Sequence, residues 1–470
     1  MTSRVRLVVV GADAAGMSGA HQALRTARRH GVDLGVTALE RTGHTSYSAC
    51  GIPYWIAGDV PGGPDGGEHL VARTAEEHRA AGIDLRLATV VEEVDLAARA
   101  VVAREPGDDR ATRIGFDHLL LATGARPRVP AWALDAAGRP LPGVFPVRSL
   151  DDGVAWIDAL LGGAGLGRRP EHAAIVGCGY IGLEMAEALL RRGLRVTVLT
   201  RREVMSSTLD PDMGALVREG MQSAGVEVVC GAAVDGVEVS GGAVRCLSAA
   251  GREFSADVVA LSTGVQPETE LAAGAGLALG ESGGLLPDQR QRVAEGVWAA
   301  GDCCESPHRL TRARAFVPLG THANKQGRVA GENLAGGSAT FHGVIGTAVT
   351  RFVAGGVHLE VARTGLDQAE AAGRDVEALV THSTTAAGYL PEAAPIAVKV
   401  LAERGSGRLL GVQIVGGPGS GKRIDTAAVA IWTGQGVADV AAMDLSYVPP
   451  LSPVWDPVQI ACRRLADRLR

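Results

Sequence analysis

One local pattern occurs twice in this chain and constrains its fold more than any other feature. In each copy a short run of β-branched and apolar residues leads into a glycine-rich turn, and a segment with helical periodicity follows. Strand, tight turn and helix in that order build the βαβ unit of a parallel sheet covered by helices. We therefore expect an α/β protein with two such domains, and 470 residues leave room for about one more.

The first copy begins with the run Val5–Val10, continues through the turn Gly11–Gly16 and predicts a helix over Met17–Arg29. The next predicted strand, Gly35–Leu39, ends at Glu40. In a dinucleotide site the turn lets the backbone approach the pyrophosphate, the helix N-terminus attracts its charge, and the acid binds ribose hydroxyls. A turn without ligand stays an alternative, since the middle glycine of the fingerprint is replaced by Asp13. The predicted contacts are Gly11, Ala15, Gly16, Glu40 and Arg41.

The second copy has all three glycines, Gly177, Gly179 and Gly182, between a predicted strand Ala173–Val176 and a helix Leu183–Arg192. Its next strand, Arg195–Leu199, is followed by Thr200, Arg201 and Arg202, so two arginines stand where an acid would bind the ribose. Guanidinium groups bind a 2′-phosphate, which an acid would repel, so this Rossmann-like domain is predicted to prefer NADPH over NADH. Two solvated surface arginines are the alternative. The predicted contacts are Gly177, Gly179, Tyr180, Ile181, Gly182, Glu184, Thr200, Arg201 and Arg202.

Three further apolar strands end in small residues, where the backbone can approach a nucleotide closely. They lie within 119–127, 258–267 and 297–302, and the last ends in Asp302, which suits sugar-like hydroxyls or a helix N-cap. The predicted contacts at these strand ends are Ala122, Thr123, Gly124, Gly264, Gly301 and Asp302.

Cys50 is the candidate redox residue. Pro53 suits the first turn of a helix, so Cys50 is expected near a helix N-terminus, which favours thiolate over thiol. A small buried hydrophobe is the alternative. The seven cysteines show no zinc-ligand spacing and no disulfide framework, so no metal is expected. A net charge of −6 argues against nucleic-acid binding, and no apolar run reaches membrane-spanning length, so we expect a cytoplasmic protein with reduced thiols.

The order of these motifs resembles the flavin-dependent pyridine nucleotide–disulfide oxidoreductases over essentially the whole chain. The resemblance implies FAD on the first glycine turn and the nicotinamide nucleotide on the second. It also implies FAD-binding segments at 1–148 and 266–342, a NAD(P)H-binding domain at 149–265 and a dimerisation domain at 343–470. Ala323 is then a further FAD contact. The last domain is expected to hold alternating strands with two late helices, and to make the protein a homodimer.

The surroundings of Cys50 resemble one branch of that family. Dithiol members have a second cysteine where this chain has Trp55, and they use a C-terminal histidine, but no histidine follows His382. The segments Ala387–Pro391 and Ser446–Pro457 are similar to the two tyrosine motifs of coenzyme A-disulfide reductases, NAD(P)H oxidases and polysulfide or persulfide reductases.

The resemblance to this branch also implies site residues. Tyr389 and Tyr447 would give the leaving sulfur a hydrogen bond or a proton. In a homodimer they would complete the partner's active site. The implied contacts to a coenzyme A-like substrate are Gln22, Arg25, Ser46 and Asn324. Three positions depart from the relatives: Ala14 replaces a histidine of peroxidases, Ala49 an asparagine and Leu390 a tyrosine.

The implied reaction passes a hydride from NADPH to FAD and electrons to Cys50, which rests as a mixed disulfide or a sulfenic acid. The freed thiolate then attacks a small disulfide, persulfide or polysulfide. An NAD(P)H oxidase that reduces oxygen, a flavoprotein redox sensor and a reductase of a specialised natural-product disulfide stay open as alternatives.

Overall fold

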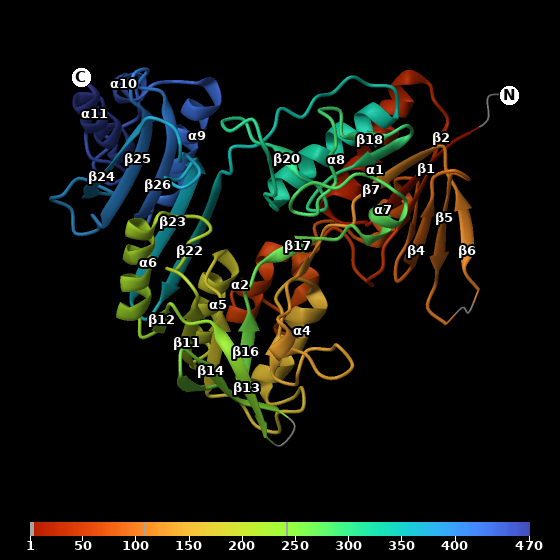
Figure 1. The fold of residues 1–470 in the computed structure, drawn as a ribbon, viewed down its shortest axis with the longest axis horizontal. Coiled ribbons are helices and arrows are strands. Elements are labelled where there is room, and N and C mark those ends of the chain that lie inside the picture. The colour runs from red at the N-terminus through yellow and green to blue at the C-terminus, as the bar shows by residue number, and fades with distance from the viewer. Residues whose placement is uncertain (1–3, 108–109, 241–242) are drawn as a thin grey trace. The chain divides into compact units, whose positions relative to one another are not determined.

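A computed structural model describes residues 4–107, 110–240 and 243–470 (Figure 1). The chain divides into two compact units. Unit 1 comprises Met1–Gly51, Gly66–Arg128 and Val265–Val344, and unit 2 comprises Ile52–Asp65, Val129–Gly264 and Ile345–Arg470. The predicted mixed α/β class is confirmed, whereas the division into four segments stays a prediction.

Unit 1 is built on a six-stranded sheet in the order β18-β19-β7-β1-β2-β3, parallel except at β18. The strands, in that order, are Arg292–Ala294, Val297–Ala299, His118–Leu121, Val5–Val10, Leu34–Leu39 and Ile83–Arg86. Because the last predicted FAD segment supplies β18 and β19, residues from both ends of unit 1 share one sheet. The predicted loops at Gly11, Glu40, Ala122 and Gly301 all follow the carboxyl ends of its parallel strands, where α/β proteins bind nucleotides.

Helices α1 (Ala14–His30) and α8 (Gly320–Leu334) pack against each other beside this sheet (Figure 1). Their approach depends on glycine: a Cβ added to Gly327 would lie 2.1 Å from the Ala15 carbonyl oxygen, and one on Gly331 would lie 2.1 Å from that of Gly19. Unit 1 also contains a three-stranded sheet, two short ribbons, two short helices and two 3-10 turns. These are β4 (Val90–Asp95), β5 (Ala100–Arg104), β6 (Thr112–Gly115), β8 (Ala125–Pro127), β17 (Val265–Pro267), β20 (Ser306–Pro307), β21 (Arg314–Ala315), α3 (Ala75–Ala80), α7 (Glu270–Gly274), η1 (Ala49–Gly51) and η2 (Gly63–Leu70), the last of which begins in unit 2.

Unit 2 contains a parallel sheet in the order β12-β11-β10-β16-β9. Its strands are Glu227–Cys230, Arg195–Thr200, His172–Val176, Val258–Leu261 and Val144–Phe145. The other elements of unit 2 before residue 345 are α2 (Ile52–Ala57), α4 (Leu150–Leu161), α5 (Tyr180–Arg191), α6 (Pro211–Ser223), η3 (Ala131–Ala133), β13 (Val234–Ser240), β14 (Ala243–Ala249) and β15 (Arg252–Ser255). Helix α5 begins inside the second glycine turn, at Tyr180, three residues before the predicted start.

The C-terminal part of unit 2 is an antiparallel sheet in the order β22-β23-β26-β25-β24. Its strands are Ala348–Ala354, Val357–Gly365, Leu409–Gly416, Pro395–Glu403 and Val376–Thr384. The 3-10 turn η4 (Gly421–Arg423) leads into α9 (Ile424–Thr433), and α10 (Val437–Ala442) and α11 (Pro457–Leu469) follow. The prediction of two late helices was therefore one helix short, because the six-residue α10 is too brief to show a periodicity. Within the described ranges, no helix combines the length and apolarity that crossing a bilayer requires.

Candidate functional site

The first glycine turn has the shape of a nucleotide cradle. Gly11 has a φ of 95°, and a Cβ there would lie 2.2 Å from the Ala122 carbonyl oxygen, so the turn accepts no larger residue. A Cβ on Gly16 would lie 1.9 Å from the Gly11 carbonyl oxygen. The side chain of Asp13, the residue before α1, makes no capping bond to that helix and accepts from the Tyr47 backbone N–H at 3.2 Å. The first turn of α1 therefore keeps its N–H groups for an anion such as a pyrophosphate.

Glu40 is buried and keeps hydrogen-bonding capacity for a ribose. One carboxylate oxygen accepts from the Ala12 N–H at 2.9 Å, and the other accepts from the Thr42 N–H and hydroxyl, both at 2.9 Å. A carboxylate has about four lone-pair sites, so one remains for a further donor. The cradle and this carboxylate together fit the adenosine diphosphate half of FAD.

The other predicted FAD contacts also lie in unit 1. The hydroxyl of Thr123 donates to the Glu268 carbonyl oxygen at 2.5 Å, and the Arg41 guanidinium lies 3.6 Å from the Glu268 carboxylate. Gly301 has a φ of 89°, in the left-handed region, and its Cβ position would meet the side chain of Ala15. Ala323 is buried on α8.

The second glycine turn repeats the geometry of the first. Gly177 has a φ of 92°, with its Cβ position 2.3 Å from the Ser262 carbonyl oxygen. Gly179 is the N-cap residue of α5, so the start of this helix faces the turn. Ile181 and Gly182 follow in the first turn of α5, and Gly264 closes the neighbouring strand with a φ of 89°.

The strand end that would meet an adenosine ribose carries a positive charge. Arg201 and Arg202 are exposed directly after Thr200, the buried last residue of β11. The next acid in the sequence, Glu203, is already engaged, because the Arg218 Nε donates to its two carboxylate oxygens at 3.0 and 3.2 Å.

Glu184 lies on α5 in a buried polar cluster. The Thr350 hydroxyl donates to its carboxylate at 2.7 Å, and the Val353 backbone N–H donates at 2.7 Å to Glu187, one turn further along the helix. Burial raises the pKa of Glu184 to about 7, with the charge of Glu187 adding to the rise and hydrogen bonds from Thr350 and Tyr54 opposing it. Glu184 therefore exchanges its proton near neutral pH, on the helix that begins at the second glycine turn.

Cys50 is exposed in the middle of η1, which leads directly into α2. Pro53 is the second residue of α2, where its missing N–H costs no hydrogen bond. The Gly51 N–H donates to the Ser48 carbonyl oxygen at 2.9 Å and closes the turn around the cysteine. Trp55, at the place of a second thiol, is 1% exposed and donates from its indole N–H to a carbonyl oxygen at 2.7 Å.

The structure brings the two tyrosine segments together in unit 2. The Ala387 N–H donates to the Pro449 carbonyl oxygen at 2.9 Å, although the two residues lie in different motifs. Tyr389 and Tyr447 are both exposed. Cys50 belongs to unit 1, so a meeting of the tyrosines with Cys50 stays a prediction.

Arg423 holds both tyrosine segments from η4. Its guanidinium donates to the Thr385 carbonyl oxygen at 2.6 Å and to the Leu451 carbonyl oxygen at 2.7 Å, and it forms an ion pair with Asp456. The side chains of Arg423 and Asp456 are 12% and 13% exposed. The largely buried Arg423 therefore ties the chain just before the first segment, through Thr385, to the second segment, through Leu451 and Asp456.

The predicted substrate contacts lie in unit 1 with different degrees of exposure. Arg25 is exposed, and it donates to the side-chain oxygen of Gln22 at 2.7 Å. Gln22 is buried, so it would act on a ligand through Arg25. Asn324 is exposed and accepts from the Ser18 hydroxyl at 2.7 Å.

Sequence reasoning missed the histidine beside Ser46 and the role of Arg423. His78 Nε2 lies 2.9 Å from the Ser46 hydroxyl, but these residues are far apart in the sequence and form no spacing motif. Arg423 contacts Thr385 and Leu451, which lie 38 and 28 residues away from it in the sequence. No local signal would have found either contact, because both depend on loops that meet only in the fold.

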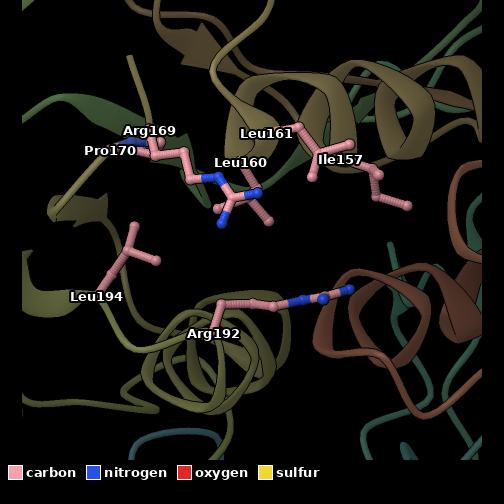
Figure 2. Close-up of a pocket in the computed structure, with 7 residues that line it drawn as sticks. All are labelled: Ile157, Leu160, Leu161, Arg169, Pro170, Arg192 and Leu194. Atoms are coloured by element: carbon pink, nitrogen blue, oxygen red, sulfur yellow. The ribbon is translucent and has the colours of Figure 1, made fainter.

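A hollow in unit 2 lies apart from the predicted site residues (Figure 2). It is lined by Ile157, Leu160, Leu161, Arg169, Pro170, Arg192 and Leu194. The Arg192 side chain extends from it toward α2, where its Nε donates to the Ile56 carbonyl oxygen at 2.6 Å (Figure 2). This arginine therefore supports α2, the helix that follows Cys50.

Comparison with known proteins identifies the family. Residues 5–316 match the pyridine nucleotide-disulphide oxidoreductase family, and residues 356–457 match the dimerisation domain of the same family. The chain belongs to the pyridine nucleotide-disulphide oxidoreductases. It is therefore a flavin-dependent NAD(P)H oxidoreductase whose two glycine turns fit FAD and a pyridine nucleotide, as the sequence predicted.

Relatives of this oxidoreductase match along its full length. The NAD(P)H sulfur oxidoreductase (CoA-dependent) of Pyrococcus furiosus is 35% identical over 98% of this chain and 99% of its own. The NADH oxidase of Methanocaldococcus jannaschii is 31% identical over 99% of both chains. The solved structure of a NAD-dependent persulfide reductase from A. fulgidus superposes with a TM-score of 0.89 at 33% identity, covering 99% of this chain and 83% of that one.

Proposed function

We propose that this protein is a FAD-dependent NADPH:disulfide oxidoreductase that reduces coenzyme A disulfide, or a related small disulfide, persulfide or polysulfide, through Cys50 alone. The observation that carries the proposal is the setting of this cysteine: Cys50 is exposed, while Trp55 fills the place of a second thiol with a buried indole. A substrate sulfur can therefore reach Cys50, and no neighbouring cysteine competes at that position. The CoA-dependent sulfur oxidoreductase of Pyrococcus furiosus supports the substrate class.

The chemistry at Cys50 is a thiol–disulfide exchange. Bound FAD supplies the two-electron link between a nicotinamide hydride and a sulfur acceptor. The Cys50 thiolate attacks one sulfur of the substrate, a new S–S bond forms, and the other half leaves as a thiolate. Two electrons that originate from NADPH then cleave the mixed disulfide, which releases the bound half of the substrate as a second thiol and restores the Cys50 thiolate.

The leaving thiolate needs a proton, and a tyrosine hydroxyl can donate one. We assign this task to Tyr389 and Tyr447, which Arg423 holds in one surface of the dimerisation domain. In the proposed homodimer, these tyrosines complete the active site of the partner subunit. We propose the cytoplasm as the site of the reaction, because a nicotinamide donor and reduced thiols suit that compartment.

NADPH is the proposed electron donor, with NADH the weaker one. Arg201 and Arg202 supply guanidinium groups at the strand end, and the nearby acid Glu203 is neutralised by Arg218. A 2′-phosphate thus meets attraction and little repulsion.

Reduction of oxygen is the second candidate function, because the relative from Methanocaldococcus jannaschii is named an NADH oxidase. In an oxidase reaction of this protein, Cys50 would cycle through a sulfenic acid. The experiment that separates the two measures NADPH oxidation by the holoenzyme, first without oxygen and with coenzyme A disulfide, a persulfide or a polysulfide as acceptor, and then with oxygen as the only acceptor. Turnover with at least one sulfur acceptor is expected. Turnover that requires oxygen and ignores every sulfur compound would establish the oxidase instead.

A further inference from the structure

Three side chains in unit 1 form a hydrogen-bonded series that ends in the loop before Cys50. His21 lies on α1, His78 on α3, and Ser46 in the loop four residues before Cys50. His21 Nε2 is 2.8 Å from His78 Nδ1, and His78 Nε2 is 2.9 Å from Ser46 Oγ. His78 is 1% exposed, so its two ring nitrogens have these side chains as partners in place of bulk water.

An arginine at the outer end fixes the direction of these hydrogen bonds. Arg73 Nη1 lies 3.0 Å from His21 Nε2, and a guanidinium can only donate. The lone pair of His21 Nε2 therefore faces Arg73 and His78, so His78 Nδ1 must carry the proton between the two rings. In a neutral His78 the other nitrogen, Nε2, is then an acceptor, and the Ser46 hydroxyl donates to it.

Both imidazoles are held in the neutral state. Burial lowers the pKa of His21 to about 4, helped by the positive charges of Arg73 and Arg25 and by the neighbouring His78 ring. Burial and Arg73 also lower the pKa of His78, whereas Glu77 on the same helix opposes the shift. At neutral pH the donors of the two hydrogen bonds that join His21, His78 and Ser46 are therefore fixed.

We propose that His78 makes Ser46 a dedicated hydrogen-bond acceptor for the substrate. Since its proton is committed to His78, the Ser46 oxygen offers only lone pairs to a ligand, and it selects a ligand that brings an N–H or S–H donor. The amide groups and terminal thiol of a pantetheine arm have this chemistry, so the inference rests on the proposed function and deepens it. His78 is a positioning residue, because it acts through Ser46.

Protonation of His78 reverses the direction of its hydrogen bond with Ser46. When the pH falls through the pKa of His78, Nε2 gains a proton and donates to Ser46, which turns the hydroxyl proton toward the ligand. A donor on the ligand then faces a donor on the protein, and affinity for the ligand falls.

The test uses the holoenzyme and two readouts. ¹⁵N-histidine NMR at neutral pH is expected to show His78 with its proton on Nδ1, and a proton on Nε2 would overturn the proposal. Calorimetric titration of coenzyme A is expected to give about tenfold weaker binding for Ser46→Ala and for His78→Phe, with no further loss in the double variant. His69→Phe, an exposed histidine in the same unit, is the matched control and should bind as wild type.

The pH dependence of coenzyme A affinity gives a further test of His78. Wild-type affinity should fall at acid pH, and the His78→Phe variant should lose that dependence. Additive losses in the double variant, or wild-type affinity in Ser46→Ala, would overturn the role of the pair. If coenzyme A does not bind the wild type, the coenzyme A part of the proposed function fails, and the proton position on His78 alone decides this inference.

Discussion

The backbone N–H of Ala387 donates to the carbonyl oxygen of Pro449 at 2.9 Å, and this bond joins the two segments that carry Tyr389 and Tyr447. Arg423 braces the same junction from a third loop, through two carbonyl oxygens and Asp456. The tyrosines are thus presented by one braced surface instead of two independent loops.

Arg423→Ala should lower the stability of the protein and its disulfide reductase activity together. The change leaves Asp456 largely buried without its ion-pair partner, which costs about 3 kcal/mol of unfolding free energy. Thermal unfolding and stopped-flow kinetics check this, with reduction of the bound FAD by NADPH expected to stay at the wild-type rate. Lys422→Ala is the control, because this neighbouring lysine is 79% exposed. If Arg423→Ala and Lys422→Ala had the same thermal stability and the same disulfide reductase activity, the bracing role of Arg423 would be contradicted.

Tyr389→Phe and Tyr447→Phe should each slow disulfide turnover by about tenfold or more, because the leaving thiolate loses a proton donor. The rate of FAD reduction by NADPH is unaffected in this account. Steady-state kinetics with the best sulfur acceptor measures the effect. Full turnover in both variants would show that these phenols have no part in the reaction.

Arg201→Asp should shift the preference from NADPH toward NADH, since the new carboxylate repels the 2′-phosphate and can bind a 2′-hydroxyl. The ratio of kcat/KM for the two nucleotides is expected to change by about tenfold or more. Arg195→Asp, at the exposed start of the same strand, is the matched control. A wild type that uses NADH as well as NADPH would already refute the assignment.

Glu184→Gln should remove a pH-dependent loss of stability. The pKa of Glu184 rises from 4.5 to about 7 on folding, so the folded protein keeps a proton that the unfolded chain loses in this window. Stability therefore falls as the pH rises from 4.5 to 7, by about 3 kcal/mol in total. Thermal unfolding between pH 4 and 9 should show the variant gaining on wild type as pH rises. Parallel curves would mean that Glu184 ionises normally.

The sequence predicted the parts of this protein that local geometry dictates. Gly11 and Gly177 adopt a φ that favours glycine and abut a neighbouring carbonyl, so their turns are visible in the sequence. Cys50 could be found because Pro53 marks a helix start.

Contacts between distant loops could not be predicted in this way. Ser46 meets His78, and Arg423 meets Leu451, only after separate elements have packed. Gln22 is buried by helix packing that no local pattern records, and its contact with the substrate stays a prediction.

In the proposed reaction one sulfur atom, on Cys50, carries electrons to the substrate. The most direct measurement compares Cys50→Ser with Cys230→Ser, a control at another exposed cysteine. The Cys50→Ser holoenzyme should still oxidise NADPH in a single turnover, but its disulfide reduction should fall by about a thousandfold or more, while Cys230→Ser stays active. Undiminished disulfide reduction by Cys50→Ser would contradict the account.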